Sequence, residues 1–499
     1  MNTRDNTPIL VGVGQVEQRI DDVHAALEPL ELMSQAIAVA ADDAGLPTVA
    51  SHADAIRVIR GMWAYENPAN ELAERLGIGG AETAITSLGG NYVQVVTNRS
   101  FRDIQSGAKD LVIVTGAECG RTRARAGRAD VELSWSPSAA PTGPVDPSNL
   151  VDLFIGSTKV TRHPAETARG IDRPVQYYPI FETALRYANG ESVDEHLRRI
   201  SELWQSFNEV AVENPHAWIR TPLTAEQIRT PSDSNRAISY PYPKLMNSNV
   251  SVDQGAALIL TSVGKARELG IPESRWVYPY AGTEAWDHLY VSERDNLHSS
   301  PAIRIAGARL FELANVSADE LDYVDLYSCF PAAVQVAAQE LGLSFDRRLT
   351  VTGGLTFAGG PLNNYVMHAV ARTADLLRES PGTRGLVTAN GGLLTKHAMC
   401  VYSTEPPAQP FQWEDLQDEV NLTPKREVQL DHEGEVSIES YVVMYGPSAP
   451  AVAHVACRLP DGSRTWANVD DPEIMQAMTQ EEFCGRPARV GDGALTVSG

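Results

Sequence analysis

Three polar side chains surround a Gly-Gly turn in the segment TANGGLLTKH, residues 388–397. A lysine and a histidine beside an apolar, glycine-rich turn are costly to bury without a partner. His397 is therefore a candidate general base, and the alternative is a histidine that caps a turn. We predict that Asn390 and His397 are catalytic and that Lys396 binds substrate.

Tyr327 lies in the segment DLYSCF, residues 325–330. A phenol can donate a hydrogen bond or act as an acid, so we predict that Tyr327 is catalytic. The alternative is a tyrosine that packs in the core. Cys329, two residues further on, is predicted to be a packing residue.

Two glycine-rich segments, TSLGGNYVQ (86–94) and VTGGLTFAGGP (351–361), lack an obvious reactive side chain. Ser87 has no local His and Asp partners, which leaves it unsupported as a nucleophile. Asn91 can supply an amide donor, whereas for His368 a packed or surface position is the alternative. The predicted substrate-binding residues are Gly89, Gly90, Asn91, Gly359, Gly360, Asn363, His368 and Lys396.

The elements that position these residues alternate between helix and strand. Residues 111–118 form a continuous apolar run typical of a buried strand, and residues 30–46 have helical apolar spacing and a glycine stop. The second half repeats the order, because residues 301–330 read as helix, turn and strand, and residues 385–392 resemble 111–118. The repeat predicts an α/β fold of two similar halves stacked in layers.

An irregular stretch separates the halves, and a different pattern follows them. Residues 120–250 are rich in Pro, Arg, Ser and Tyr, while residues 425–495 hold alternating apolar runs separated by turn residues. The second pattern predicts a small antiparallel barrel or sandwich. The predicted units are an N-terminal half (1–120), an insertion (121–265), a C-terminal half (266–405) and a β-barrel domain (413–499).

Several segments together resemble the thiolase superfamily, in its sterol-carrier-protein-2-type and thiolase-like type 1 branch. The resemblance covers about residues 7–405, and it rests on SGAKDLVIVTGAE (106–118), KLMNSNVSVDQGAALIL (244–260), DLYSCF (325–330) and GGLTFAGGP (353–361). It implies the thiolase fold, with layers in the order α-β-α-β-α, and an additional C-terminal barrel. It also implies an acyl-CoA acyltransferase of lipid metabolism.

The chain departs from the family where the reaction occurs. The family's nucleophilic cysteine falls within Ser87 to Gly90, with Gly90 as the best match, its activating histidine falls at Gly360, and its second cysteine falls at or near Ala389. Tyr327 replaces the residue that binds a thioester oxygen in the family. The resemblance therefore implies action on acyl-CoA thioesters without a covalent acyl-enzyme. Two alternatives are retro-aldol cleavage of a 3-hydroxyacyl-CoA, and acyl-CoA binding or scaffolding without catalysis.

Composition limits the partners and the compartment. The net charge of −23 disfavours nucleic acid and anionic membranes, and no apolar run approaches the roughly 20 residues of a membrane span. Five scattered cysteines without a pairing or zinc-binding pattern favour a reducing compartment. We expect a cytoplasmic monomer or homodimer that binds CoA or an acyl-CoA as substrate, with no metal and no further cofactor.

Overall fold

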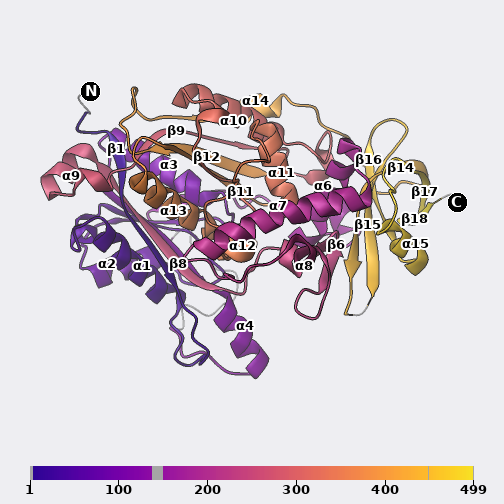
Figure 1. Cartoon of the computed structure of the whole chain (residues 1–499), viewed down its shortest axis with the longest axis horizontal. Coiled ribbons are helices and arrows are strands. Elements are labelled where there is room, and N and C mark those ends of the chain that lie inside the picture. The colour runs from indigo at the N-terminus through magenta and orange to yellow at the C-terminus, as the bar shows by residue number, and fades with distance from the viewer. Residues whose placement is uncertain (1–3, 137–149, 448, 498–499) are drawn as a thin grey trace.

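The computed structural model describes residues 4–136, 150–447 and 449–497. Its core is a pair of mixed β-sheets (Figure 1). The first has the order β1-β8-β4-β2-β3-β5. Its strands are β1 (Pro8–Glu17), β2 (Ala55–Val58), β3 (Glu82–Thr86), β4 (Leu111–Cys119), β5 (Leu153–Ile155) and β8 (Asp253–Ser262).

The second sheet has the order β10-β11-β12-β9-β13. Its strands are β9 (Tyr278–Trp286), β10 (Tyr323–Asp325), β11 (Arg384–Gly391), β12 (Lys396–Ser403) and β13 (Gln412–Asp415). The series β10-β11-β12-β9 repeats the series β2-β4-β8-β1 of the first sheet. In both series the first pairing is parallel and the next two are antiparallel. The predicted pair of similar halves is confirmed.

Helices cover both sheets and fill the space between them. The middle layer consists of α3 (Tyr92–Gln105) and α13 (Tyr365–Glu379), which contact strands of both sheets. Outside the first sheet lie α1 (Pro29–Asp43) and α2 (Pro68–Leu76), and outside the second lie α10 (Pro301–Ala314) and α11 (Pro331–Glu340). The layers follow the predicted order α-β-α-β-α. Every residue of β4 is buried, which explains its continuous apolar run.

The predicted insertion contains more regular structure than its composition suggests. Its helices are α4 (Gly120–Ala129), α5 (Pro164–Thr167), α6 (Pro174–Asn189), α7 (Val193–Glu213) and α8 (Ala225–Arg229), and its short strands are β6 (Ala237–Tyr240) and β7 (Tyr242–Pro243). Strand β8 also lies within the range 121–265, yet it pairs between β1 and β4 in the first sheet. The four-part division of the chain stays a prediction.

The C-terminal region forms a closed five-stranded barrel. Its strands are β14 (Gly434–Tyr445), β15 (Pro450–Arg458), β16 (Arg464–Val469), β17 (Pro487–Gly491) and β18 (Ala494–Val497), and a short helix, α15 (Pro472–Met478), lies between β16 and β17. Four pairings are antiparallel, but β16 and β18 pair in parallel, so the expected fully antiparallel barrel is corrected in this one contact. Strand β6 of the insertion pairs with β14 and joins the barrel to the rest of the protein.

The remaining helices are α9 (Val263–Leu269), α12 (Gly354–Phe357) and α14 (Gln417–Asn421). Within the described ranges, no helix is both long and apolar enough to cross a membrane.

Candidate functional site

The turn between β3 and α3 lies against the second half of the molecule. A Cβ atom added to Gly90 would lie 2.4 Å from Tyr327 Oη and 2.6 Å from the carbonyl oxygen of Asn390. Atoms do not approach this closely without displacement, and one of the two obstacles is backbone. The phenol of Tyr327 therefore occupies the space that a side chain at position 90 would need.

Tyr327 follows β10, and both its backbone and its ring are held by neighbouring residues. Its backbone N–H donates to Thr388 Oγ1 at 2.9 Å, and its ring meets the ring of Tyr365 edge-on at 5.6 Å between centroids. Burial, with a smaller contribution from Cys329, raises the pKa of Tyr327 above its usual range. The phenol therefore keeps its proton at neutral pH.

Asn390 and His397 lie directly opposite each other on β11 and β12. Asn390 Nδ2 donates to Tyr178 Oη at 3.0 Å, and His397 Nε2 lies 3.3 Å from Asp287 Oδ2. Together with Tyr327, both residues line a space of about 10 Å³ between the second sheet and helices α10 and α11. Such a space has room for roughly one water molecule. The structure thus brings the three predicted catalytic residues together, but leaves no room for a substrate among them.

Asp287 is an ionised partner for His397. Burial alone would raise the pKa of the Asp287 carboxyl, but His397 and the nearby guanidinium of Arg294 outweigh it and hold the pKa below its usual range. Ser300 Oγ and the Ala302 N–H also donate to the Asp287 carboxylate. The pair is therefore a fixed, buried contact of the second sheet.

Lys396 precedes His397 on β12, so its side chain points to the other face of the second sheet, because successive residues of a strand point to opposite sides. Asn91, at the start of α3, lies on that face as well. Lys396 is 4% exposed, and its ammonium lies 4.6 Å from the ring centroid of Trp286 and 5.5 Å from that of Tyr92. Burial lowers the pKa of Lys396. Asn91 is fully buried, and neither polar atom of its amide has a hydrogen-bond partner among the described residues.

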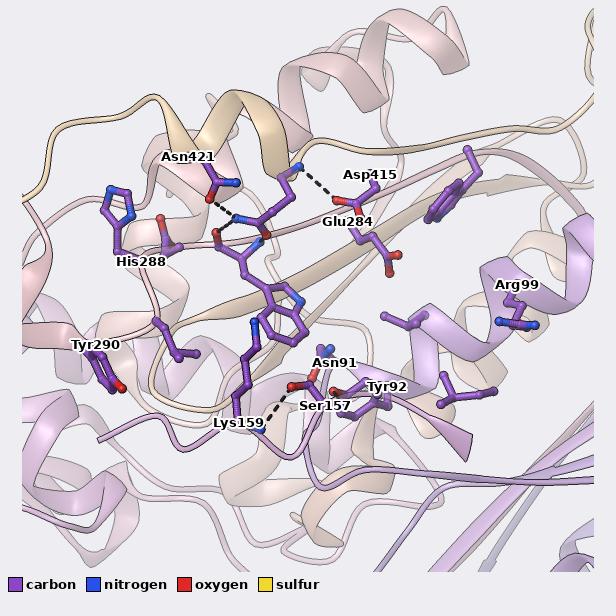
Figure 2. Close-up of a pocket in the computed structure, with 18 of the residues that line it drawn as sticks. Asn91, Tyr92, Arg99, Ser157, Lys159, Glu284, His288, Tyr290, Asp415 and Asn421 are labelled. Carbon is purple, nitrogen blue, oxygen red and sulfur yellow. Dashed lines mark hydrogen bonds between the residues drawn. The ribbon is translucent and has the colours of Figure 1, made fainter. Parts of the chain in front are cut away.

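A cavity of about 790 Å³ opens beside Asn91 (Figure 2). Its walls come from the start of α3, residues 155–159, the end of β9 with the loop after it, and residues 413–425. This volume lies within the ~300–1,000 Å³ of small-molecule sites. Of the predicted substrate-binding residues, Asn91 alone is among those that line it.

Three further predicted residues gather at the other end of the same turn. Asn363 Oδ1 accepts from the Gly89 N–H at 3.0 Å, while its Nδ2 donates to Arg60 O at 2.6 Å. Gly360 lines a separate cavity of about 640 Å³, and a Cβ added there would meet nothing closer than 3.4 Å. Gly359, its neighbour, has a φ of 114° and packs against Gln254.

His368 lies apart from these residues. It is buried on α13, and its Nδ1 contacts Gln15 Oε1 of β1 at 2.9 Å. Burial lowers the pKa of His368 to about 4, with a smaller contribution from His216. His368 is therefore neutral at physiological pH, in a packed position.

Sequence reasoning missed Tyr178 and Asp287. Tyr178 is buried on α6 and accepts from both Asn390 Nδ2 and the Leu394 N–H. Nothing near it in the sequence indicates this contact, since the partners are more than 200 positions away. Asp287 had a usable signal, because it is an acidic residue directly after a buried strand.

Comparison with known proteins identifies the architecture. The additional C-terminal domain of thiolase-like proteins of type 1 matches residues 415–493. A monomeric SCP2-thiolase-like protein type 1 from Mycobacterium smegmatis superposes with a TM-score of 0.83 and 29% identity, over 99% of this chain and 100% of that one. The chain therefore has the thiolase fold and carries the additional C-terminal domain of thiolase-like proteins of type 1.

Two further proteins resemble this thiolase-like chain at lower sequence identity. An acetyl-CoA acetyltransferase from Methanocaldococcus jannaschii is 25% identical over 174 residues, a match that spans 31% of this chain and 43% of that protein's length. An Ltp2-ChsH2(DUF35) aldolase shares the fold, with a TM-score of 0.59 and 19% identity over 80% of this chain and 98% of that one. Within the described part of the thiolase-like chain, no group of three or more His, Cys, Asp or Glu residues is arranged to hold a metal ion.

Proposed function

We propose that this chain acts on acyl-CoA thioesters and breaks a carbon–carbon bond by retro-aldol cleavage of a 3-hydroxyacyl-CoA, without a covalent acyl-enzyme. The observation that carries the proposal is the filled space at Gly90. A nucleophilic side chain does not fit there, and the group that fills the space is the phenol of Tyr327.

The chemistry requires a base for the 3-hydroxyl and donors for the oxygen of the thioester, where negative charge develops as the bond breaks. The candidate donors are the Asn91 amide, which borders the cavity of about 790 Å³, and Tyr327 Oη, which lies beside the preceding residue, Gly90. The substrate class is supported by the names of two relatives, an acetyl-CoA acetyltransferase and an aldolase.

Binding of acyl-CoA without turnover is the second candidate. It is favoured by the space of about 10 Å³ around Tyr327, Asn390 and His397, which admits no substrate. The two candidates differ in one readout, the appearance of product.

The test is a mass-spectrometric assay of the purified protein with 3-hydroxyacyl-CoA and 3-ketoacyl-CoA esters, with and without free CoA. We expect cleavage of the hydroxyacyl ester that does not depend on free CoA. Tyr327→Phe should lower kcat by roughly 10²–10³, the usual effect of removing one oxyanion donor. Tyr323→Phe, on the adjacent strand β10, should leave kcat unchanged.

Three results would contradict the proposal in different ways. Cleavage of the ketoacyl ester that requires free CoA would indicate a true thiolase. Binding without product would favour the second candidate. An undiminished rate in Tyr327→Phe would exclude this phenol from the reaction.

A further inference from the structure

The room that is missing around His397 is present on the α3 side of the second sheet. The cavity of about 790 Å³ lies between the start of α3 and the end of β9, and Figure 2 shows Asn91 and Glu284 among its lining side chains. The proposed reaction needs a base, and the acidic residues of this cavity are candidates for it.

Glu284 differs from the other acids of the cavity in having no partner. It lies on β9, two residues before Trp286, so both side chains point to the α3 side. Among the described residues, no hydrogen bond or ion pair engages its carboxyl. The other acids are occupied: Asp287 accepts from Ser300 and Ala302, Glu293 pairs with Lys425, and Asp415 accepts from the Gln417 N–H.

The surroundings of Glu284 bring the pKa of its carboxyl close to neutral pH. Burial raises the pKa of its carboxyl to about 7, Asp415 of β13 acts in the same direction, and Arg102 of α3 opposes them. Tyr92 of α3 and Lys396 of β12 also belong to this face. A carboxyl that loses its proton near the working pH is suited to general base catalysis.

The wall of the cavity at the start of α3 carries groups that favour negative charge. Asn91 precedes the 14-residue helix α3, its amide is buried, and both amide atoms lack partners within the described ranges. The start of a helix favours negative charge, and the ammonium of Lys396 lies over the neighbouring ring of Tyr92. These groups favour the negative charge of an enolate.

We propose that Glu284 is the general base of the retro-aldol reaction and that this cavity holds the 3-hydroxyacyl group; the inference rests on the proposed function. Glu284 takes the proton of the 3-hydroxyl, the C2–C3 bond breaks, and its electron pair becomes an enolate whose charge lies on the thioester oxygen near the Asn91 amide. The former C3 becomes a carbonyl carbon. The carboxyl then returns the proton to C2, which yields a shorter acyl-CoA and an aldehyde or ketone.

The experiment measures kcat against pH for the full-length protein with 3-hydroxybutyryl-CoA and longer 3-hydroxyacyl-CoA esters. The unprotonated carboxylate is the active form, so kcat should rise with pH and level off above the Glu284 pKa of about 7. Glu284→Gln should lower kcat by roughly 10² or more and remove this pH dependence. Its affinity for the product acetyl-CoA, measured by calorimetry, should be unchanged.

Two further variants control for structural effects. Glu414→Gln removes a carboxylate of β13 that pairs with Arg309 outside the cavity, and it should keep the wild-type rate and pH profile. Glu284→Asp keeps the carboxylate and should restore part of the rate.

The outcomes separate the two proposals. If the wild type cleaves no hydroxyacyl ester, the proposed function fails and the role of Glu284 fails with it. If the wild type is active and Glu284→Gln keeps its rate and pH profile, the role of Glu284 is overturned while the proposed function stands. Equal losses in Glu284→Asp and Glu284→Gln, with the fold intact, would also overturn it.

Discussion

Gly90 and Gly360, where the resemblance places the family's cysteine and histidine, differ in the room around them. A Cβ at Gly90 meets Tyr327 Oη at 2.4 Å and a backbone oxygen at 2.6 Å, whereas a Cβ at Gly360 meets only contacts of 3.4 Å or more. We expect Gly90→Ala to destabilise the protein by ~1–3 kcal/mol, as overpacking usually does, and Gly360→Ala to have little effect. The apparent melting temperatures of the two variants check this.

The variants Gly90→Ala and Gly360→Ala also test whether the phenol of Tyr327 fills the space beside Gly90. Tyr327→Phe removes the nearer atom, so in that background the cost of Gly90→Ala should shrink. Equal melting temperatures for Gly90→Ala and Gly360→Ala in the wild-type background would contradict the account.

Some candidate residues can be singled out from the sequence, and others cannot. Tyr327, Asn390 and His397 stand out in the sequence as a phenol, an amide and an imidazole beside recognisable segments, and they line one small space. Their catalytic role stays a prediction. Glu284 was not found, because the segment YPYAGTEAW contains one acid with no partner nearby in the sequence. The proposed role of Glu284 depends on which face of β9 borders a cavity. The sequence of a single strand does not reveal which face that is.

At the scale of elements, Arg464 of β16 links the barrel to the C-terminal half, and a buried ion pair with Glu439 of β14 holds its guanidinium in place. Glu439 Oε2 accepts from Arg464 Nε at 2.7 Å, and Arg464 also donates to Ser292 O at 2.6 Å in the C-terminal half. Burial alone would raise the pKa of Glu439, but Arg464 outweighs it and holds the pKa below its usual value. The carboxylate therefore stabilises the fold when ionised.

Glu439→Gln should lower stability at pH 7 by ~3–5 kcal/mol, because Arg464 stays buried without its counter-charge. The stabilising contribution is fully present above the unfolded-state pKa of 4.5 and is lost as pH falls through the lower folded-state value. The difference in melting temperature between wild type and variant should therefore narrow below pH 4.5. Glu435→Gln, an exposed change on the same strand, should show no such difference at any pH.

Elements with strong local patterns were predictable, and those defined by distant partners were not. Strand β4 agrees with the predicted 111–118 within one residue, and helix α1 agrees with the predicted 30–46 within three. Strands β6 and β7 are four and two residues long, and they exist because β14 offers an edge more than 200 residues away. Such pairings leave little trace in local periodicity.

At the scale of the whole molecule, β5 occupies the outer edge of the first sheet. It pairs in parallel with β3, from Ala84 and Leu153 to Thr86 and Ile155. β5 is only three residues long, and so short an edge strand offers few unpaired backbone groups for pairing with a second copy. We expect light scattering to give a mass of 54.1 kDa across a wide range of concentrations. A stable species of twice that mass would show that another surface mediates association.

The contact between Gly90 and Tyr327 also limits which substitutions these two positions can accept. A cysteine at position 90 collides with the phenol, and the loss of the phenol alone supplies no thiol. A thiol nucleophile at this position therefore requires two replacements together, that of the glycine and that of the phenol. The contact thus makes positions 90 and 327 interdependent, so that the residues tolerated at one position depend on the residue at the other.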